Sequence, residues 1–197
     1  MTWRWLILLI CAVGIGGCTN TPREETAMTE IRTSDDGAHD FDFFVGDWIV
    51  ENRKLLKPLE GSDEWETFQA RQSNRRLPGG IGNFDDFIAE TWRPGFVGMS
   101  LRIFNPETKL WSIYWLNNRN GGIDSKTGAL TPPVVGKFEN GIGVFNAADE
   151  FNGKPIIVRY TWSHITTNSA RWEQAFSPDS GKSWEANWIM DLTRVAV

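Results

Sequence analysis

The sequence is short of cysteine, tyrosine, histidine and positive charge. Among its 197 residues there are 2 cysteines, 2 tyrosines and 2 histidines, and the formal net charge is −5. An acidic chain lacks the cationic field that phosphate binding requires, so we expect no nucleic-acid partner. No cysteines or paired histidines occur at the spacing of metal ligands, so we expect no metal site. Hydrophobic residues make up 41% and charged residues 23%, which excludes a fibrous or disordered chain.

Both cysteines lie within the first 18 residues, in a segment typical of a lipoprotein signal peptide. One positive charge, Arg4, precedes an apolar run over 6–15, which is too short to span a bilayer about 30 Å thick. The following residues, Ile15-Gly16-Gly17-Cys18, resemble the bacterial lipobox. The resemblance implies that residues 1–17 are removed, that the thiol of Cys18 is diacylated, and that the chain is tethered to a membrane. The alternative is ordinary signal cleavage that leaves Cys18 free.

The residues after Cys18 indicate a cellular location and a flexible tether. Thr19 stands where an inner-membrane retention signal would have aspartate. We therefore expect the protein to be located in the bacterial cell envelope, on the periplasmic side of the outer membrane. Residues 18–40 are polar and without periodicity, and we interpret them as a flexible tether. Loss of Arg4 leaves 19 basic against 25 acidic residues, a mature charge of −6. The domain expected over 41–197 has no cysteine, so its core alone must stabilise it.

From Phe41 onward, short runs of alternating apolar and polar residues are separated by turn residues, which is typical of antiparallel strands. A short helical turn is expected at 40–45. Asn140-Gly141 and Asn152-Gly153 are type I′ hairpin dipeptides, and further turns are expected at 105–108, 166–168 and 177–183. Three more strands are expected upstream, at about 46–56, 65–76 and 83–91.

These turns predict strand registers, because a slip of one residue moves every side chain to the other face. The opposed pairs include Phe138 with Gly143, Phe145 with Tyr160, Trp162 with Trp172, Tyr160 with Gln174, Trp172 with Trp188, Phe176 with Trp184, Ile103 with Trp111 and Met99 with Trp115. One face of the sheet is then apolar. The other is polar and carries Arg102, Ser112, Lys137, Asn146, Arg159, Arg171, Glu173, Glu185, Asn187 and Asp191.

About ten short strands with one apolar face predict an all-β domain. An antiparallel meander with one polar, solvent-exposed (wet) face must cover its apolar face from water. We therefore predict an antiparallel up-and-down meander closed into a barrel. A two-sheet sandwich is the alternative, but it needs crossover connections, against which the tight hairpins argue.

Both ends of the domain carry a resemblance to known families. Phe41-Asp42-Phe43 and Gly46-Asp47-Trp48 resemble the start of the lipocalin and wider calycin signature. The resemblance implies a calycin-like barrel in which Gly46 and Trp48 belong to the closed end and Arg194 packs over the tryptophan. Together with the block Arg-Trp-Glu-Gln-Ala-Phe-Ser that begins residues 171–188, this start is similar to an uncharacterised bacterial calycin-like lipoprotein family. That similarity implies a fold and no activity.

Residues 177–184 also match the Asp-box of sialidase-like propellers. A propeller repeats such hairpins through several blades of about 40–50 residues. This domain has one, so we interpret it as a structural turn and not as a sign of glycosidase activity.

The predicted apolar face is rich in aromatic residues. It holds Trp111, Trp115, Trp162, Trp172, Trp184 and Trp188, with Phe138, Phe145 and Phe176. Small residues on the same face, Gly136, Gly143, Ala147 and Ala186, leave room between them. These side chains either fill a packed core or line a ligand cavity, which a ten-stranded barrel is wide enough to enclose.

Few polar groups interrupt this face. Tyr160 and Gln174 are expected to oppose each other, and they either satisfy each other or orient a ligand. His164 lies near a strand end; it is either a rim residue or, as in calycin-like barrels that bind haem through one histidine, a haem ligand. The adjacent carboxylates Asp85 and Asp86 point to opposite sides of a strand, so they do not form a catalytic dyad.

The leading hypothesis is a lipid-anchored, extracytoplasmic barrel that binds a small, largely apolar or aromatic ligand and needs no cofactor. Candidate ligand-binding residues are Trp111, Trp115, Tyr160, Trp162, His164, Trp172, Gln174 and Trp188, with Asn52, Gln72 and Asn74 from the less regular first strands. One alternative is an enzyme that isomerises, cyclises or hydrates a hydrophobic substrate, with Tyr160, His164 or a first-strand polar group as acid or base. The other is a structural envelope lipoprotein. The sequence leaves the oligomeric state open.

Overall fold

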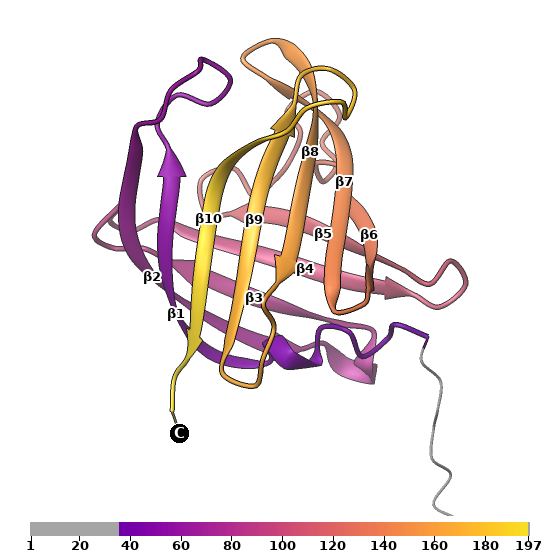
Figure 1. Cartoon of the computed structure of the whole chain (residues 1–197). Coiled ribbons are helices and arrows are strands. Elements are labelled where there is room, and N and C mark those ends of the chain that lie inside the picture. Colours follow the sequence, from indigo (N-terminus) through magenta and orange to yellow (C-terminus); the bar gives the residue numbers. More distant parts are fainter. Residues whose placement is uncertain (1–35, 197) are drawn as a thin grey trace, which may run out of the picture. The chain divides into compact units, whose positions relative to one another are not determined.

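Ten strands close into one antiparallel barrel, as the run of hairpins predicts (Figure 1). The structure, a computed structural model, describes residues 36–196. The predicted signal peptide, Cys18 and most of the predicted tether lie outside the described residues. The strands are β1 Gly46–Leu55, β2 Trp65–Arg76, β3 Gly82–Ile88, β4 Val97–Asn105, β5 Leu110–Asn117, β6 Val134–Glu139, β7 Ile142–Phe151, β8 Lys154–Ser163, β9 Ser169–Ser177 and β10 Glu185–Arg194. Each strand pairs with its neighbours in sequence, and β1 pairs with β10.

Two short 3-10 helices, η1 Asp42–Phe44 and η2 Pro78–Gly80, accompany the strands. η1 lies at the position expected for the helical turn. Within residues 36–196, no helix has the length and apolar character needed to cross a membrane.

Strands β6 to β9 have the register that their turns predict. Asn140 and Asn152 each have a φ of 51°, the left-handed conformation that a type I′ turn needs at its first central residue. Phe145 lies opposite Tyr160 across β7 and β8, and the pairing of β8 with β9 also follows the prediction. Phe145, Trp162 and Trp172 therefore lie on the inner face of the barrel.

The predicted register of β4 is wrong by one residue. The loop that follows it has four residues and ends at Lys109, which adopts the left-handed conformation with a φ of 59°. Phe104, and not Ile103, therefore lies opposite Trp111. Because side chains alternate along a strand, the slip moves Arg102 from the predicted wet face into the barrel, where it is 3% exposed.

The predicted pairing of β9 with β10 is also wrong, because β10 contains a β-bulge at Asn187. Met190, and not Trp188, lies opposite Trp172, while Trp188 lies opposite Gln174. A bulge inserts one residue into a strand and redirects side chains there. Asn187, predicted on the wet face, is buried as a result.

The β9–β10 loop is an Asp-box turn built around the Asp179 carboxylate. The carboxylate accepts hydrogen bonds from the Ser177 hydroxyl at 2.8 Å and from the amide and hydroxyl of Ser183 at 2.9 Å and 2.7 Å. Trp184 was predicted inside the barrel, but its ring lies 3.5 Å from the guanidinium carbon of Arg159, a residue on the outer face of β8. Trp184 therefore belongs to the turn and not to the inner aromatic wall.

We expect this turn to titrate far below neutral pH. Hydrogen bonds to the carboxylate, the largest from the Ser183 amide, lower the pKa of Asp179 to about 2. Because the folded pKa is depressed, the stability that ionised Asp179 contributes is present above its ordinary pKa of 3.8 and is lost as the pH falls through about 2. The NMR shift of the Ser183 amide should titrate near pH 2, and Asp179→Asn should abolish the step. A midpoint near 3.8 would contradict the assignment.

Aromatic residues before β1 plug one end of the barrel, the lower end in Figure 1. Phe41, which precedes η1, and Phe44, its last residue, are both buried. Their ring centres lie 5.9 Å and 4.9 Å from that of Trp162, and Phe41 also lies 5.0 Å from Trp111. We call Phe41 and Phe44 the plug.

Gly46, Trp48 and Arg194 lie together beside the plug. The Trp48 indole nitrogen donates to the Phe44 carbonyl at 2.8 Å, and the Arg194 guanidinium carbon lies 4.2 Å from the centre of the Trp48 ring. Arg194 also donates to the Val45 carbonyl at 2.7 Å. Gly46 has a φ of 121°, and a Cβ there would lie 2.7 Å from Arg194 Nη1, so this position requires glycine.

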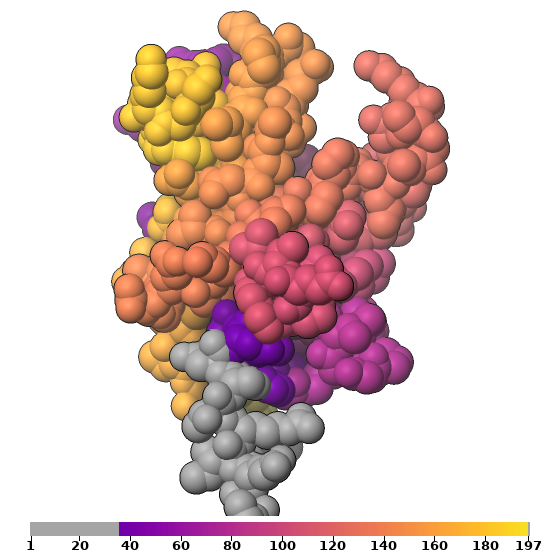
Figure 2. Space-filling view, turned by 90° about the vertical axis from the view of Figure 1, so that its right-hand side faces the viewer, coloured from indigo at the N-terminus to yellow at the C-terminus, as the bar shows by residue number. Residues whose placement is uncertain are grey.

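Residues just before η1 also contact the barrel. The Gly37 carbonyl accepts a hydrogen bond from the Trp111 indole at 2.9 Å, and the Asp36 carboxylate lies 3.4 Å from Lys109 Nζ. Figure 2 shows this indigo segment next to the β4–β5 and β2–β3 turns. The packed chain therefore begins before the boundary expected at Phe41.

Candidate functional site

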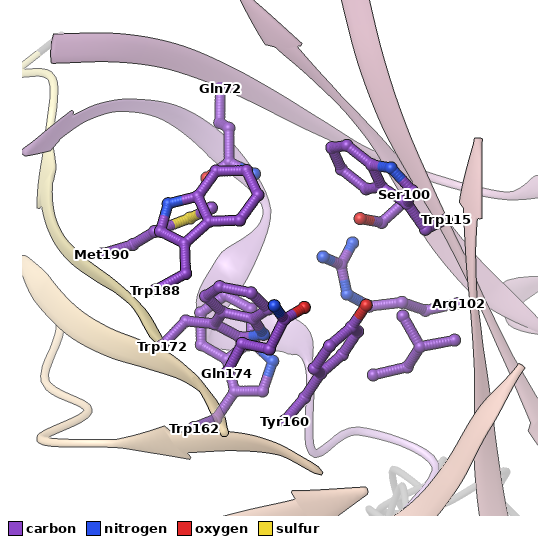
Figure 3. Close-up of a pocket in the computed structure, with 11 residues that line it drawn as sticks. Gln72, Ser100, Arg102, Trp115, Tyr160, Trp162, Trp172, Gln174, Trp188 and Met190 are labelled. Carbon is purple, nitrogen blue, oxygen red and sulfur yellow. The ribbon is translucent and has the colours of Figure 1, made fainter. Parts of the chain in front are cut away.

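The barrel encloses a cavity of about 80 Å³ on the inner side of the plug. A water molecule needs roughly 10–15 Å³ of such space, so the cavity holds several waters or part of an organic ligand. Its lining residues come from β2, β4, β5, β8, β9 and β10 (Figure 3): Gln72, Ser100, Arg102, Ile113, Trp115, Tyr160, Trp162, Trp172, Gln174, Trp188 and Met190. We call this space the inner cavity.

Aromatic rings from β8, β9 and β10 form one wall of the inner cavity. Trp172 is the centre of this wall, with its ring 4.9 Å from that of Tyr160 and 5.8 Å from that of Trp188, both in edge-on geometry. Edge-to-face contacts at these distances are favourable and hold the rings in defined orientations. The wall therefore presents a shaped apolar surface to an occupant.

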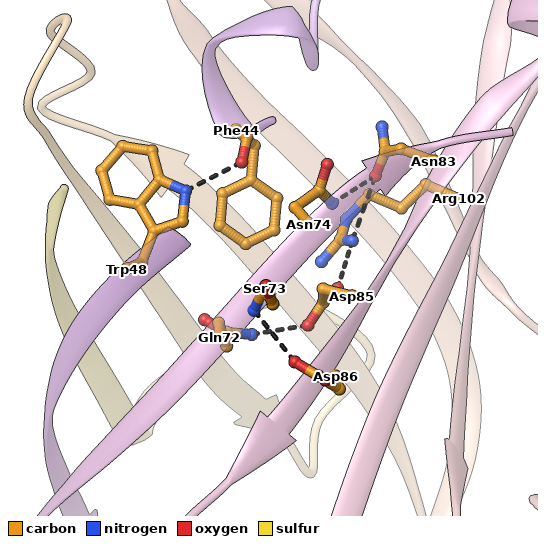
Figure 4. Close-up of polar contacts among 9 residues, drawn as sticks. All are labelled: Phe44, Trp48, Gln72, Ser73, Asn74, Asn83, Asp85, Asp86 and Arg102. Atoms are coloured by element: carbon orange, nitrogen blue, oxygen red, sulfur yellow. Dashed lines mark hydrogen bonds and ion pairs between the residues drawn. The ribbon is translucent and has the colours of Figure 1, made fainter. Parts of the chain in front are cut away.

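A buried polar cluster from β2, β3 and β4 forms another part of the site (Figure 4). Arg102 donates to one oxygen of the Asp85 carboxylate, and Gln72 Nε2 donates to the other at 2.7 Å. Asp85 has no exposed surface. Burial raises the pKa of Asp85 above its ordinary value, although the Arg102 charge and the Gln72 hydrogen bond act in the opposite direction.

Asparagine side chains belong to this polar cluster and also form a separate hydrogen bond to Trp188. Asn83 Oδ1 accepts hydrogen bonds from Asn74 Nδ2 at 2.9 Å and from Arg102 at 3.3 Å. On β1, which pairs with β2, Asn52 Oδ1 accepts a hydrogen bond from the Trp188 indole at 2.9 Å. Asn52 and Asn74 thus position residues of the inner cavity without lining it themselves.

Tyr160 and Gln174 lie opposite each other but do not satisfy each other. Gln174 Nε2 donates instead to Asn187 Oδ1 at 2.8 Å, a contact that exists because the bulge turns Asn187 inward. The Tyr160 hydroxyl has no hydrogen-bond partner among residues 36–196. Burial, with a smaller effect of the Asp149 charge, raises the pKa of Tyr160 to about 12, so the hydroxyl keeps its proton at neutral pH.

Three buried polar atoms of the lining residues lack a partner within the described part of the chain. They are Trp162 Nε1, Arg102 Nε and Gln72 Oε1. Leaving such an atom unpaired costs about 1–3 kcal/mol, so native proteins pair nearly all of them. Their convergence on one cavity indicates that its natural contents, water or ligand, form hydrogen bonds.

Aromatic and cationic side chains surround Trp188 at the end of the barrel away from the plug. We call this end the mouth. Trp92, in the β3–β4 loop, stacks on Phe68 with ring centres 4.4 Å apart, and Lys54 Nζ lies 3.9 Å from the centre of the Trp188 ring. Burial, and then repulsion from Arg93, lower the pKa of Lys54 to about 8. Sequence periodicity missed Trp92 because it lies in a loop.

A second cavity, of about 190 Å³, adjoins the first where β6 is short. In the described chain β5 and β6 pair only over Trp111–Ile113 and Val134–Gly136, so the upper part of β5 borders the 118–133 loop instead. Figure 2 shows part of this loop, in salmon, projecting from the barrel. We call it the outer cavity. The two cavities share the lining residues Ile113, Trp115 and Tyr160, so they lie next to each other.

The structure brings seven of the candidate ligand residues together around the inner cavity: Gln72, Trp115, Tyr160, Trp162, Trp172, Gln174 and Trp188. Trp111 lies at the closed end, against Phe41. His164 is exposed in the β8–β9 turn, with its Nδ1 3.0 Å from the Ser163 hydroxyl, and does not line the cavity. Sequence periodicity missed Ser100 and Arg102, because a register that is wrong by one residue exchanges the inner and outer faces of β4.

Comparisons with known proteins bear on the fold. No protein-family model matches the sequence, and no curated protein matches it. Among solved structures, that of the S-type phycobiliprotein lyase CPES from Guillardia theta is similar, with a TM-score of 0.52 and 8% sequence identity over 80% of this chain and 91% of that chain. A likeness at this identity shows the fold alone. The chain folds as a calycin-like barrel of ten antiparallel strands.

Proposed function

We propose that this protein binds a small, largely apolar or aromatic ligand inside its barrel, outside the cytoplasm, at a membrane to which Cys18 is lipid-linked. The observation that carries the proposal is the inner cavity, which combines an aromatic wall with unpaired buried polar atoms. A core built for packing alone has no reason to leave such atoms unpaired. The signal-peptide pattern of residues 1–17 supports the cell envelope, on the periplasmic side of the outer membrane, as the location.

The size of the site limits the ligand. Pockets for drug-sized molecules measure about 300–1,000 Å³, and the inner cavity is far smaller. We therefore propose a ligand with one ring in the inner cavity and any further atoms in the adjoining outer cavity. Haem ligated by His164 is not part of the proposal, because His164 lies outside the cavity. The lyase activity named for the similar structure is not carried over either.

Binding, and not turnover, is the function that the side chains favour. A general acid or base works best with a pKa near the operating pH, whereas Tyr160 has a pKa of about 12. His164, another candidate acid or base of the sequence, is exposed in a turn. We therefore propose no enzymatic reaction for this cavity.

We expect the mature protein, with its lipid anchor in lipid nanodiscs, to bind the aromatic probe cumene, and Ser100→Met to weaken that binding at least tenfold. Ser100 lines the inner cavity and methionine adapts its shape to irregular gaps, so the longer side chain should occupy the space of the ligand. Ligand-observed NMR measures the dissociation constant, with empty nanodiscs as the reference for partitioning into lipid.

Ser112→Met is the matched control. Ser112 lies on β5 with its side chain on the outer face, so this variant should bind cumene like the unmodified protein. No binding of cumene to the unmodified protein, or equal loss in both variants, would contradict a ligand site in the inner cavity.

A further inference from the structure

We infer that the ligand presents an uncharged hydrogen-bond-accepting oxygen, such as a ketone or quinone carbonyl, to a donor seat formed by Arg102 Nε, Trp162 Nε1 and the Tyr160 hydroxyl. This inference rests on the proposed function and specifies the chemical class of its ligand. Its basis is the set of unpaired donors in the inner cavity and the charge balance behind them.

Arg102 and Trp162 meet at the plug end of the inner cavity. The Arg102 guanidinium carbon lies 4.8 Å from the ring centre of Phe44 and 5.8 Å from that of Trp162. Tyr160 is two residues before Trp162 on β8, so both side chains point to the same side of the strand. Figure 3 shows the Tyr160 hydroxyl and the Arg102 guanidinium directed toward the same part of the cavity. The three donors therefore lie on side chains that line the same cavity, and we infer that they form one seat.

The unpaired atoms of this seat are donors. Trp162 and Arg102 are 2% and 3% exposed, so neither unpaired N–H reaches bulk solvent, and the Tyr160 hydroxyl keeps its proton. An indole or guanidinium nitrogen can only donate, which requires an acceptor in the occupant. Gln72 Oε1 is the unpaired acceptor at the cavity, and a water in the same space can satisfy it. A carbonyl oxygen matches the donors and displaces water without losing their hydrogen bonds.

The charge behind the seat favours a neutral oxygen over a carboxylate. The positive charge of Arg102 is already balanced by Asp85, which is buried against it. A ligand carboxylate would add a second negative charge to a closed space, and burying an unbalanced charge is strongly unfavourable. Lys54, whose ammonium group lies against the Trp188 ring, is at the mouth of the barrel and not at the seat. A ketone oxygen avoids this penalty.

Three probes of similar size test the inference on the mature protein in nanodiscs: cumene, acetophenone and benzoate at pH 7.5. Removing one donor should weaken acetophenone binding about fivefold, the equivalent of one net hydrogen bond. Tyr160→Phe and Trp162→Phe each remove a donor and retain an aromatic ring. We expect both to lower the acetophenone-to-cumene affinity ratio about fivefold, whereas Trp184→Phe, outside the barrel wall, should leave the ratio unchanged.

Asp85→Asn tests the charge argument, because it removes the negative charge that balances Arg102. We expect benzoate to bind the unmodified protein more weakly than acetophenone and to gain at least tenfold in this variant. Circular dichroism establishes whether the variant folds; if it does not, the benzoate-to-acetophenone comparison in the unmodified protein decides the point.

Two results would overturn the inference and leave the proposed function standing. One is a parallel change of cumene and acetophenone binding in both aromatic variants, and the other is tighter binding of benzoate than of acetophenone to the unmodified protein. Failure of all three probes to bind would count against the proposed function itself.

Discussion

Replacing Arg102 with leucine is expected to lower the free energy of unfolding by about 3–5 kcal/mol, because it leaves the Asp85 carboxylate buried without its cation. Asp85 has no exposed surface, and its other partner, Gln72, is neutral. Urea unfolding followed by tryptophan fluorescence at pH 7.5 measures the loss. The change also removes one of the cavity donors, so stability, and not binding, is the readout here.

The loss should depend on pH. Burial already raises the pKa of Asp85, and the leucine variant lacks the Arg102 charge that opposes this rise. Asp85 then binds a proton more readily in the folded state than in the unfolded state, so the stability of the variant rises as the pH falls through the folded pKa. We expect the difference from the unmodified protein to shrink between pH 7.5 and pH 4.5.

The double variant Asp85→Leu with Arg102→Leu is the control. Replacing both members of a buried pair with apolar residues often costs little, so the double variant should be more stable than Arg102→Leu alone. A pH-independent loss, or a double variant as unstable as the single one, would show that the deficit comes from packing and not from the uncompensated carboxylate.

Replacing Trp48 with alanine should cost about 3–5 kcal/mol, the range for a large buried aromatic residue. Trp48 is 1% exposed, donates to the Phe44 carbonyl and lies beneath the Arg194 guanidinium. The change therefore removes ring packing, one hydrogen bond and the cation–π contact at the closed end of the barrel. Thermal unfolding by circular dichroism provides the comparison.

Trp65→Ala is the matched control for Trp48→Ala. Trp65 is also a strand tryptophan, at the start of β2, but it is 37% exposed. We expect its replacement to cost less than about 1 kcal/mol, because surface substitutions rarely cost more. Equal losses in the two variants would contradict the role assigned to Trp48 and the plug.

Local chemistry made the hairpins of β6 to β9 predictable. A type I′ turn needs left-handed residues, Asn-Gly supplies them, and the turn then dictates which residues of the two strands oppose each other. Asn140 and Asn152 adopt this conformation. The aromatic wall of Tyr160, Trp162 and Trp172 follows from these turns by alternation alone.

The β4 register could not be predicted in the same way. Its turn ends at Lys109, a residue type that rarely adopts a positive φ. The side chains of β4 mislead as well: Met99 and Ile103 point outward, while Ser100 and Arg102 point inward. An arginine is tolerated inside because β3 brings Asp85 against it, and periodicity in β4 carries no information about that partner.

The sequence by itself determined the ten-stranded architecture and which aromatic residues of β8 and β9 face inward, because turns and alternation act over a few residues. The tertiary structure decided what kind of interior results. Closure of the barrel buries Arg102 against Asp85, and the bulge at Asn187 draws Gln174 away from Tyr160. These contacts join neighbouring strands, but they depend on the β4 register and on a β-bulge that the local sequence pattern does not encode. The polar half of the cavity, and with it the chemistry of the proposed ligand, therefore depends on the tertiary structure.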